Sequence, residues 1–222
     1  TFNEDRPWIQ KKIIHILHLV TVALSHTTIC VSKTTKQQLR APSFLEKKCV
    51  VVHNGISPIT FKPVNAFYED FQIKRKERTA IVSIGELHPS KGFDLALSHL
   101  QHLQDLSWEW FILGEGHARA SLEALIAKHD LSSRVHLVGH VHDAASYLES
   151  FDLFFLPSRT EALAYVAIEA LQTDLPIIAS NVGGIPEVLG KDPGTNLVDI
   201  RHETTENTLR ESLSSYPQKI TT

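Results

Sequence analysis

The sequence predicts an α/β fold built on a parallel sheet, and three observations support this. Short apolar segments at about 80–85, 108–113, 135–138, 152–156 and 175–180 have the length of buried strands. Helical patterns fill the intervals, and strands connected through helices pair in parallel by right-handed crossovers. A chain of 222 residues that is 42% hydrophobic can bury such a core. We therefore expect a Rossmann-like sheet with helices on both faces.

The first sixty residues predict a smaller unit of helix, strand, helix and strand. A helix-start pattern occupies residues 5–7, where Pro7 suits the first helical turn. Thr27–Val31 and Cys49–His53 are short, β-branched and apolar, as buried parallel strands are. Between them, Ser32 is a candidate N-cap for a helix over Lys33–Arg40. This order predicts part of a second Rossmann-like domain.

The periodic pattern is lost between the two units. Ser57–Arg78 contains two prolines and a run of basic residues at 74–76, which we interpret as a linker with a solvated charge run. The predicted domains are residues 1–57, the final part of an amino-terminal domain; residues 58–200, the main Rossmann-like domain; and residues 201–222, a truncated carboxyl-terminal helical region.

The longest apolar-rich stretch is Ile13–Leu24, which His15 and His18 interrupt. A helix that crosses a bilayer needs about 20 largely apolar residues, so we expect no membrane span here. A core helix is the preferred interpretation. A helix lying at a membrane surface is the alternative, because lysines and histidines accompany the apolar face.

Composition excludes several classes of function. The net charge of −3 provides no basic surface for a phosphate backbone, so we expect no nucleic-acid partner. Cys30 and Cys49 form no CxxC motif, which favours a reducing cytoplasm. The thirteen histidines include no HExxH motif, and no metal site is expected. Because the chain opens with Thr1 and lacks methionine, we interpret it as a piece of a longer protein.

In parallel sheets, ligands bind at the carboxyl ends of the strands, so the loops there are the candidate sites. The first such loop, Gly85–Gly92, ends in Lys91 and Gly92. Lys91 lies where the helix macrodipole is positive, a position that favours an anion and disfavours a cation unless an anion is shared. This placement indicates a phosphate ligand. An exposed lysine at a helix start is the alternative.

A second candidate is the segment from Glu161 to Leu171. Ala162–Leu171 contains one charge, Glu169, and predicts a buried helix. A buried carboxylate needs a partner, and Glu161 would lie about 12 Å away along the axis. A helix N-terminus between two carboxylates suits a ligand with hydroxyls, phosphates and hydroxyls in turn, such as a nucleotide sugar. Alternatively, Glu169 pairs with a core histidine or arginine.

Glycine turns follow two other strands. Gly183 and Gly184 would let the backbone approach a ligand, although a plain tight turn also explains them. Gly114-Glu115-Gly116 begins like a dinucleotide-binding fingerprint but does not complete it, because residue 119 is Arg119.

Taken in order, these motifs resemble those of the retaining glycosyltransferases of family four, enzymes of the GT-B fold. The resemblance covers about residues 54–198. It rests on the asparagine-glycine turn at Asn54-Gly55, the G-x-L…K-G segment at 85–92, the glycine turn at 114–116, the strand and turn at 135–141, the E-x7-E pair Glu161 and Glu169, and the glycine-glycine-x-x-E turn at 183–187.

The resemblance implies roles for individual residues. Lys91 would contact the donor diphosphate, Glu169 the ribose hydroxyls and Glu161 the transferred sugar, with Lys91 and Glu161 as the catalytic pair. The donor-binding set is Gly85, Lys91, Gly114, Gly139, Val141, Glu161, Ala162, Leu163, Ala164, Glu169, Gly183 and Gly184.

Two departures from the family pattern stand out. Glu86 replaces a common arginine and is a candidate to pair with Lys91 in place of phosphate. Ala162 and Ala164 replace glycines, at a cost in backbone freedom.

The family likeness implies transfer of a sugar from a nucleotide-sugar donor to a glycan or lipid-linked acceptor, with retention of configuration and without a metal or other cofactor. The implied location is the cytoplasm, with peripheral association at the inner face of the membrane. Most acceptor contacts would lie in the part of the amino-terminal domain that precedes residue 1, so this chain alone is expected to be inactive. A GT-B nucleotide-sugar epimerase and a non-catalytic binding module remain alternatives.

Overall fold

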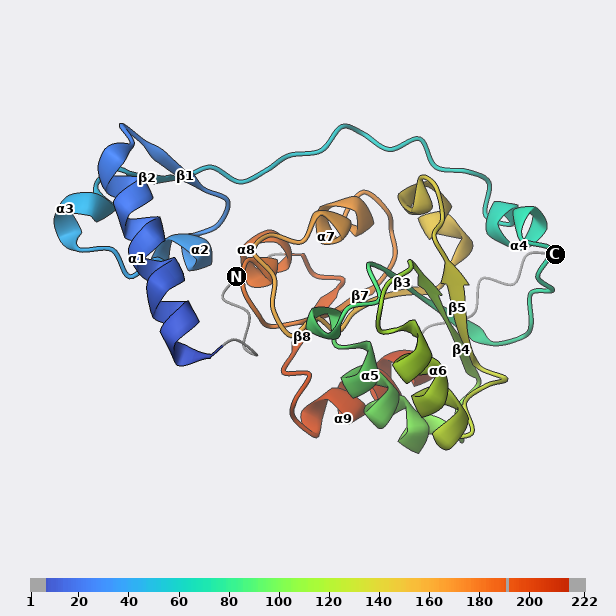
Figure 1. Ribbon diagram of the computed structural model, residues 1–222. Coiled ribbons are helices and arrows are strands. Elements are labelled where there is room, and N and C mark those ends of the chain that lie inside the picture. Colours follow the sequence, from blue (N-terminus) through green and yellow to red (C-terminus); the bar gives the residue numbers. More distant parts are fainter. Residues whose placement is uncertain (1–6, 191, 216–222) are drawn as a thin grey trace.

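The computed structural model contains two units of parallel sheet joined by one extended segment, and it describes residues 7–190 and 192–215 (Figure 1). The larger unit, called here the sheet domain (residues 66–215), has six strands, all parallel, in the order β5-β4-β3-β6-β7-β8. Its strands are β3 (Thr79–Ile84), β4 (Trp108–Leu113), β5 (Val135–Gly139), β6 (Leu153–Leu156), β7 (Ile177–Ser180) and β8 (Thr195–Val198). The expected fold class is confirmed.

The strand order fixes where a ligand can enter the sheet domain. Counted from its first strand, the order is 3-2-1-4-5-6, the doubly wound arrangement. The chain winds outward in one direction from β3 through β4 to β5, and then returns to place β6 on the other side of β3. In doubly wound sheets, ligands bind at the carboxyl ends of the strands where the winding reverses, which places the candidate site at the loops after β3 and β6.

Helices cover both faces of the sheet. Figure 1 shows α5, α6 and α9 on one face and α4, α7 and α8 on the other. These helices are α4 (Ala66–Asp70), α5 (Phe93–Leu100), α6 (Arg119–Lys128), α7 (Tyr165–Ala170), α8 (Ile185–Leu189) and α9 (Thr204–Ser215), with the 3-10 turns η1 (Pro89–Lys91), η2 (Gln101–Leu103) and η3 (Ala144–Ser150).

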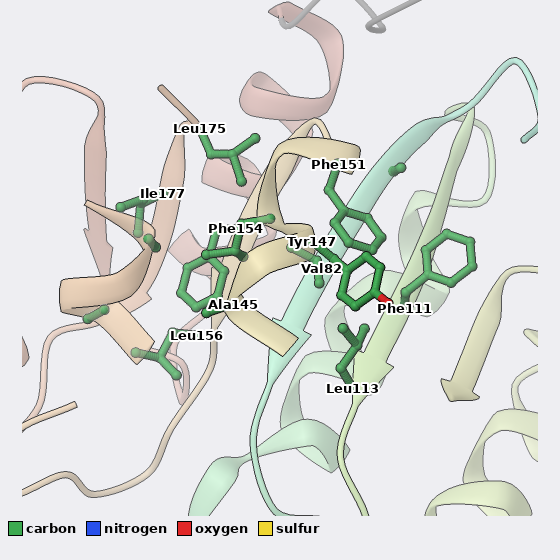
Figure 2. Close-up of a cluster of buried hydrophobic side chains, with 14 of the residues drawn as sticks. Val82, Phe111, Leu113, Ala145, Tyr147, Phe151, Phe154, Leu156, Leu175 and Ile177 are labelled. Carbon is green, nitrogen blue, oxygen red and sulfur yellow. The ribbon is translucent and has the colours of Figure 1, made fainter. Parts of the chain in front are cut away.

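Alternate strand residues supply two separate cores, because successive side chains of a strand point to opposite faces. On one face, Phe111 and Phe154 pack with residues of α4, η3 and α7, and Figure 2 shows this aromatic and aliphatic cluster. On the other face, Trp110 and Phe155 pack with α5, α6 and α9. Burial on both faces explains why these strands are nearly continuous apolar runs in the sequence.

The five strands predicted for this unit all occur, with bounds that differ by two residues or fewer. The edge strand β8, which pairs with β7, was not predicted from the sequence. Its residues are largely half-buried or exposed and include Thr195 and Asn196, so the apolar run that marks a central strand is absent.

The amino-terminal unit (residues 8–51) consists of a helix, a strand, two short helices and a strand. Its elements are α1 (Trp8–Leu24), β1 (Thr28–Cys30), α2 (Lys33–Gln38), α3 (Ser43–Glu46) and β2 (Cys49–Val51). The two strands pair in parallel, as predicted, and Ser32 accepts a hydrogen bond from the Thr35 N–H as the N-cap of α2. Part of the helix-start pattern at residues 5–7 lies outside the described residues.

The expectation that residues 13–24 form a core helix is wrong for this structure. Of the α1 residues, only Val22 is buried, in a small core with Cys30, Leu45 and Cys49. A row of apolar side chains on α1 is exposed instead: Trp8, Ile9, Ile13, Ile16, Leu17, Val20 and Leu24. The unit contains too few residues to cover this helix on both sides.

The interpretation of residues 57–78 as a linker with a solvated charge run holds only for its first part. An extended segment leads from β2 to α4, but Phe67 and Tyr68 of α4 are buried in the core of the sheet domain. Nη2 of Arg75 donates to both oxygens of the buried Asp152 carboxylate, at 2.9 and 3.0 Å, and Lys76 lies 3.3 Å from buried Glu109. These charges stabilise packing against the sheet.

In the region predicted as a truncated carboxyl-terminal helix, α9 spans Thr204–Ser215, and its Leu209 and Leu213 are buried against the sheet. Residues 216–222 lie outside the described residues. Among the described helices, none combines the length and the apolar character that a bilayer crossing requires.

We predict that Asp152→Ala destabilises the protein by about 3 kcal/mol, because the Arg75 guanidinium and the Ala80 N–H would lose their common buried acceptor. Chemical denaturation measures the change. Asp105→Ala is the matched control, since Asp105 forms an exposed pair with Arg210 that contributes about 1 kcal/mol or less. Equal losses in the two variants would contradict the assignment.

Candidate functional site at the sheet crossover

Lys91 and Glu161, which are 70 residues apart in sequence, meet where the winding of the sheet reverses. Lys91 ends the 3-10 turn η1 that follows β3, and Glu161 lies in the loop that follows β6. Their contact, Nζ to Oε1, is 2.6 Å, with both side chains largely shielded from solvent. Doubly wound folds hold their ligands at this edge of the sheet.

Small neighbours let the Lys91 side chain reach this position. The stem of Lys91 lies over Gly85, where a Cβ would stand 3.6 Å from the lysine Cδ and Cε. The hydroxyl of Ser158 donates to the same Glu161 oxygen at 2.9 Å. Glu86 is exposed, and the recorded partner of Lys91 is Glu161, so the suggested Glu86–Lys91 pair does not form.

The two loops are joined by further contacts that sequence reasoning missed. Arg159 binds the carboxylate of Asp94 in a bidentate pair and also donates to the Pro89 carbonyl at 2.7 Å. Gly92, at φ +68°, has no room for a side chain, since a Cβ would lie 2.0 Å from the Pro157 carbonyl oxygen. The loops after β3 and β6 therefore form one continuous wall.

Burial raises the pKa of Glu169 above its usual range, and the negative charge of Asp143 adds to the shift. Among the described residues, no hydrogen bond or ion pair reaches this half-buried carboxylate. Asp143 immediately precedes η3, in the loop after β5, and η3 packs against α7. Glu169 is therefore an unsatisfied acceptor beside that loop, and the core-pairing alternative is not what the structure contains.

The predicted helix over residues 162–171 is shorter than expected. The helix α7 begins only at Tyr165, so Glu161 and the segment Ala162–Ala164 belong to the preceding loop. Nor is α7 buried all round: Tyr165 is exposed, and Ala167 and Ala170 supply its buried face. Glu161 and Glu169 thus do not bracket one continuous helix, and the axial spacing of about 12 Å does not apply.

The loops after β4 and β5 lie beside this wall. Gly114 donates its N–H to the Gly139 carbonyl at 2.8 Å, and a Cβ on Gly114 would stand 1.9 Å from the Gly85 carbonyl oxygen. Gly139 has φ +91°, Val141 is buried, and the Arg119 guanidinium lies over Gly139. The predicted glycines therefore allow close approach of three neighbouring loops.

Gly183 and Gly184, in the turn after β7, pack against the loop after β6. A Cβ on Gly183, at φ +58°, would stand 1.7 Å from the Glu161 carbonyl oxygen, and one on Gly184 would stand 2.4 Å from that of Ala162. Leu163 and Ala164 are buried. The two glycines pack directly against the loop that contains Glu161.

A family model for the group 1 glycosyl transferases matches residues 66–217. The chain belongs to this family. The matched range covers the whole described sheet domain, including both loops of the crossover and all residues of the predicted donor-binding set.

Relatives and solved structures agree with this assignment. A phosphatidylinositol N-acetylglucosaminyltransferase GPI3 subunit of Saccharomyces cerevisiae is 30% identical over 191 residues, which cover 82% of this chain and 40% of that relative. Sucrose-phosphate synthase of Thermosynechococcus elongatus aligns with a TM-score of 0.81 at 20% identity, over 97% of this chain and 55% of that one. Anabaena HepE, solved in complex with UDP, aligns at 0.74 and 17% identity, over 90% and 60% of the two chains.

These structural neighbours are glycosyltransferases of the GT-B type, and at such identities they establish the fold alone. The present glycosyl transferase chain spans about half the length of the proteins that it matches. Within residues 7–190 and 192–215 it contains no group of three histidine, cysteine or acidic side chains that could hold a metal ion.

The structure brings together part of the predicted set directly, through contacts of Lys91, Gly85, Glu161, Gly183 and Gly184. Glu169 is not in direct contact with Lys91 or Glu161 among the described interactions and lies beside the loop after β5. Sequence reasoning missed Ser158, Arg159 and Asp94, because single polar residues in loops form no motif. The adjacency of Ser158 and Arg159 to Glu161 was the available indication.

We predict that Glu169→Gln raises the melting temperature of this glycosyl transferase at pH 7 by about 2 °C. The raised pKa of Glu169 means that folding disfavours its ionised form, so the carboxylate is destabilising above its folded pKa. Below the ordinary value of 4.5 the group is protonated in both states, and the advantage of the variant should disappear. Thermal denaturation at pH 7 and pH 4 measures both; a lower melting temperature at pH 7 would contradict the assignment.

Proposed function

We propose that this chain is the donor-binding part of a GT-B glycosyltransferase that takes a sugar from a nucleotide-sugar donor and retains its configuration. The contact between Lys91 and Glu161 at the sheet crossover is the observation that carries the proposal. The bond to be broken joins the sugar to the diphosphate of the donor. A cation at this position suits the anionic phosphate that departs, and an acid beside it suits the hydroxyls of the sugar.

In this proposal, Lys91 stabilises the negative charge that develops on the diphosphate leaving group. Its ammonium group has three N–H donors, and one is bonded to Glu161. The remaining donors and the backbone N–H groups of the crossover loops supply the stabilising charge, so that no metal ion is required. Glu161 keeps one carboxylate oxygen on Lys91 and Ser158 and directs the other to sugar hydroxyls.

Glu169 has the properties expected of a ribose ligand. Its carboxylate is half-buried and lacks a protein partner among the described residues, so two ribose hydroxyls would satisfy it. It lies beside the loop after β5, where main-chain groups of Gly139 and Val141 would hold the nucleobase. Base, ribose and diphosphate would thus run from that loop toward Lys91.

The remaining residues of the proposed donor-binding set would contribute backbone surface, because they have small or buried side chains that are not ligands. Gly85, Gly114, Gly183 and Gly184 permit close backbone approach, and the segment Ala162–Ala164 lines the loop behind Glu161.

We further propose that the nucleotide is UDP and the acceptor a lipid-linked or glycan group. UDP is named in the complex of Anabaena HepE, and the yeast relative is named as acting on phosphatidylinositol. Membership of family four and peripheral attachment at the cytoplasmic face of a membrane belong to the same proposal. The exposed apolar row of α1 would be covered by further residues of an acceptor domain, of which residues 1–57 are the final part.

The donor test is titration calorimetry of the intact protein with UDP and UDP-N-acetylglucosamine. Lys91→Ala should weaken both affinities by about 10- to 100-fold, because a hydrogen bond to a charged group contributes about 1.5–3 kcal/mol. Lys128→Ala, an exposed lysine at the other end of the sheet, is the control and should change affinity less than twofold. Unchanged affinity in Lys91→Ala would contradict the phosphate role.

The reaction test incubates the intact protein with donor, first alone and then with a lipid acceptor. Transfer predicts a glycosylated lipid with the donor's anomeric configuration, and no product without acceptor. An isomerised nucleotide sugar formed from donor alone would instead identify an epimerase, and tight binding with neither product would identify a binding module.

A further inference from the structure

The first turn of α2 in the amino-terminal unit is bound by a carboxylate of the sheet domain. Glu187, in α8, accepts hydrogen bonds from the backbone N–H groups of Lys33 and Thr34, each at 2.8 Å. The initial N–H groups of a helix have no partner within the helix and need an external acceptor. Here that acceptor comes from a residue more than 150 positions away in sequence.

Two more groups from the amino-terminal unit and the segment that follows it complete the contact. The Thr34 hydroxyl lies 3.0 Å from Glu187 and 2.9 Å from the Gly183 carbonyl, and His53 Nε2 lies 3.1 Å from the second oxygen of Glu187. The Glu187 side chain is only 15% exposed. All its recorded partners belong to residues 33–53, so the carboxylate serves the contact between the two units.

The pKa of Glu187 reflects this arrangement. Burial alone would raise it, but the hydrogen bonds from Thr34, Lys33 and His53 outweigh burial and lower the pKa to about 2. Because the folded pKa is below the ordinary one, this contribution to stability is present above pH 4.5 and is lost as pH falls toward 2. The carboxylate is therefore ionised and bound throughout the physiological range.

The glycine turn at 183–184, which precedes Glu187 in the chain, is in contact with the candidate site. The Gly184 N–H lies 3.3 Å from the Glu161 carbonyl, and a side chain on Gly183 would overlap that carbonyl. On its other side, a Cβ on Gly184 would stand 3.1 Å from the Cβ of buried Ser32. The glycine turn is thus held between the start of α2 and the loop that contains Glu161.

We propose that Glu187 is a positioning residue that fixes the amino-terminal unit against the crossover loop, so that the two units keep one spacing across the donor site. Its relevance to sugar transfer rests on the proposed function, whereas the contact itself does not. Loss of the Glu187 carboxylate releases α2 and lets the units separate. The sheet domain keeps Lys91, Glu161 and Glu169, and therefore keeps the donor.

The first test is amide hydrogen exchange of the intact protein, followed at Lys33 and Thr34. Glu187→Gln should accelerate exchange at least tenfold at one of the two amides, because each amide is bonded to a different carboxylate oxygen and the glutamine NH2 group that replaces one oxygen cannot accept a hydrogen bond. Glu211→Gln, which neutralises an exposed carboxylate on α9, is the matched control and should leave both amides unchanged. Unchanged exchange in Glu187→Gln would overturn the proposal.

Thr34→Val is the milder second variant, for use if Glu187→Gln does not fold. It removes the hydroxyl contacts with Gly183 and Glu187 but keeps both backbone N–H groups. We expect faster exchange at Lys33 and Thr34, by about threefold, with the rest of the sheet domain unaffected. Exchange identical to that of the unaltered protein would count against the contact.

The kinetic readout separates positioning from general destabilisation. In Glu187→Gln, kcat for transfer should fall at least tenfold while the calorimetric Kd for UDP stays within threefold. A parallel loss of donor affinity would overturn the positioning role in favour of a purely structural one. If the unaltered protein bound no nucleotide, the proposed function would fail, and the exchange experiment would still decide whether Glu187 holds the two units together.

Discussion

The reversal of winding between β3 and β6 is the constraint on which the rest of this structure depends. Right-handed crossovers send the chain to one side of β3 and later to the other, so the loops after these two central strands meet at one edge of the sheet. At this point Lys91 and Glu161, from the two loops, form an ion pair. Their charges are tolerated there because each is the partner of the other.

The apolar interior of the sheet provides a rigid support for the polar site at its edge. Apolar side chains on both faces anchor the strands, and the Arg75–Asp152 pair holds the segment that enters the first strand. This rigid support allows the loops at the carboxyl ends to keep an unsatisfied carboxylate at Glu169. Such a group lowers stability in the absence of a ligand, and it is typical of a surface built for binding.

The glycine turn at 183–184 lies between the candidate site and the amino-terminal unit. It packs against the backbone of Glu161 and Ala162, and it also supports the contact of Glu187 with the start of α2. An enzyme of two lobes must hold one substrate in each lobe and bring them to a fixed distance. In the proposed function, a turn that contacts both the loop containing Glu161 and the neighbouring unit would help to set that distance.

The sequence by itself determined the sheet domain. Its buried parallel strands are apolar on both faces, and such runs remain recognisable without knowledge of their partners. The same holds for Lys91, Glu161 and the glycines, because their order along the chain follows the order of the strand ends. Hence the fold class, the five strands from β3 to β7 and the loops that form the candidate site could be predicted, whereas the partly exposed edge strand β8 could not.

Only the tertiary structure decided how side chains are paired. The basic residues at 74–76 have the composition of a solvated run, but Arg75 is bound by a buried aspartate that follows it by 77 residues. The helix expected from residue 162 begins at Tyr165, because the loop before it packs against Gly183 and Gly184. Glu187 has an ordinary helical context in sequence, and its partners are supplied by another unit. Local composition sets which elements form, whereas the partner of a charge is set by segments that only folding brings together.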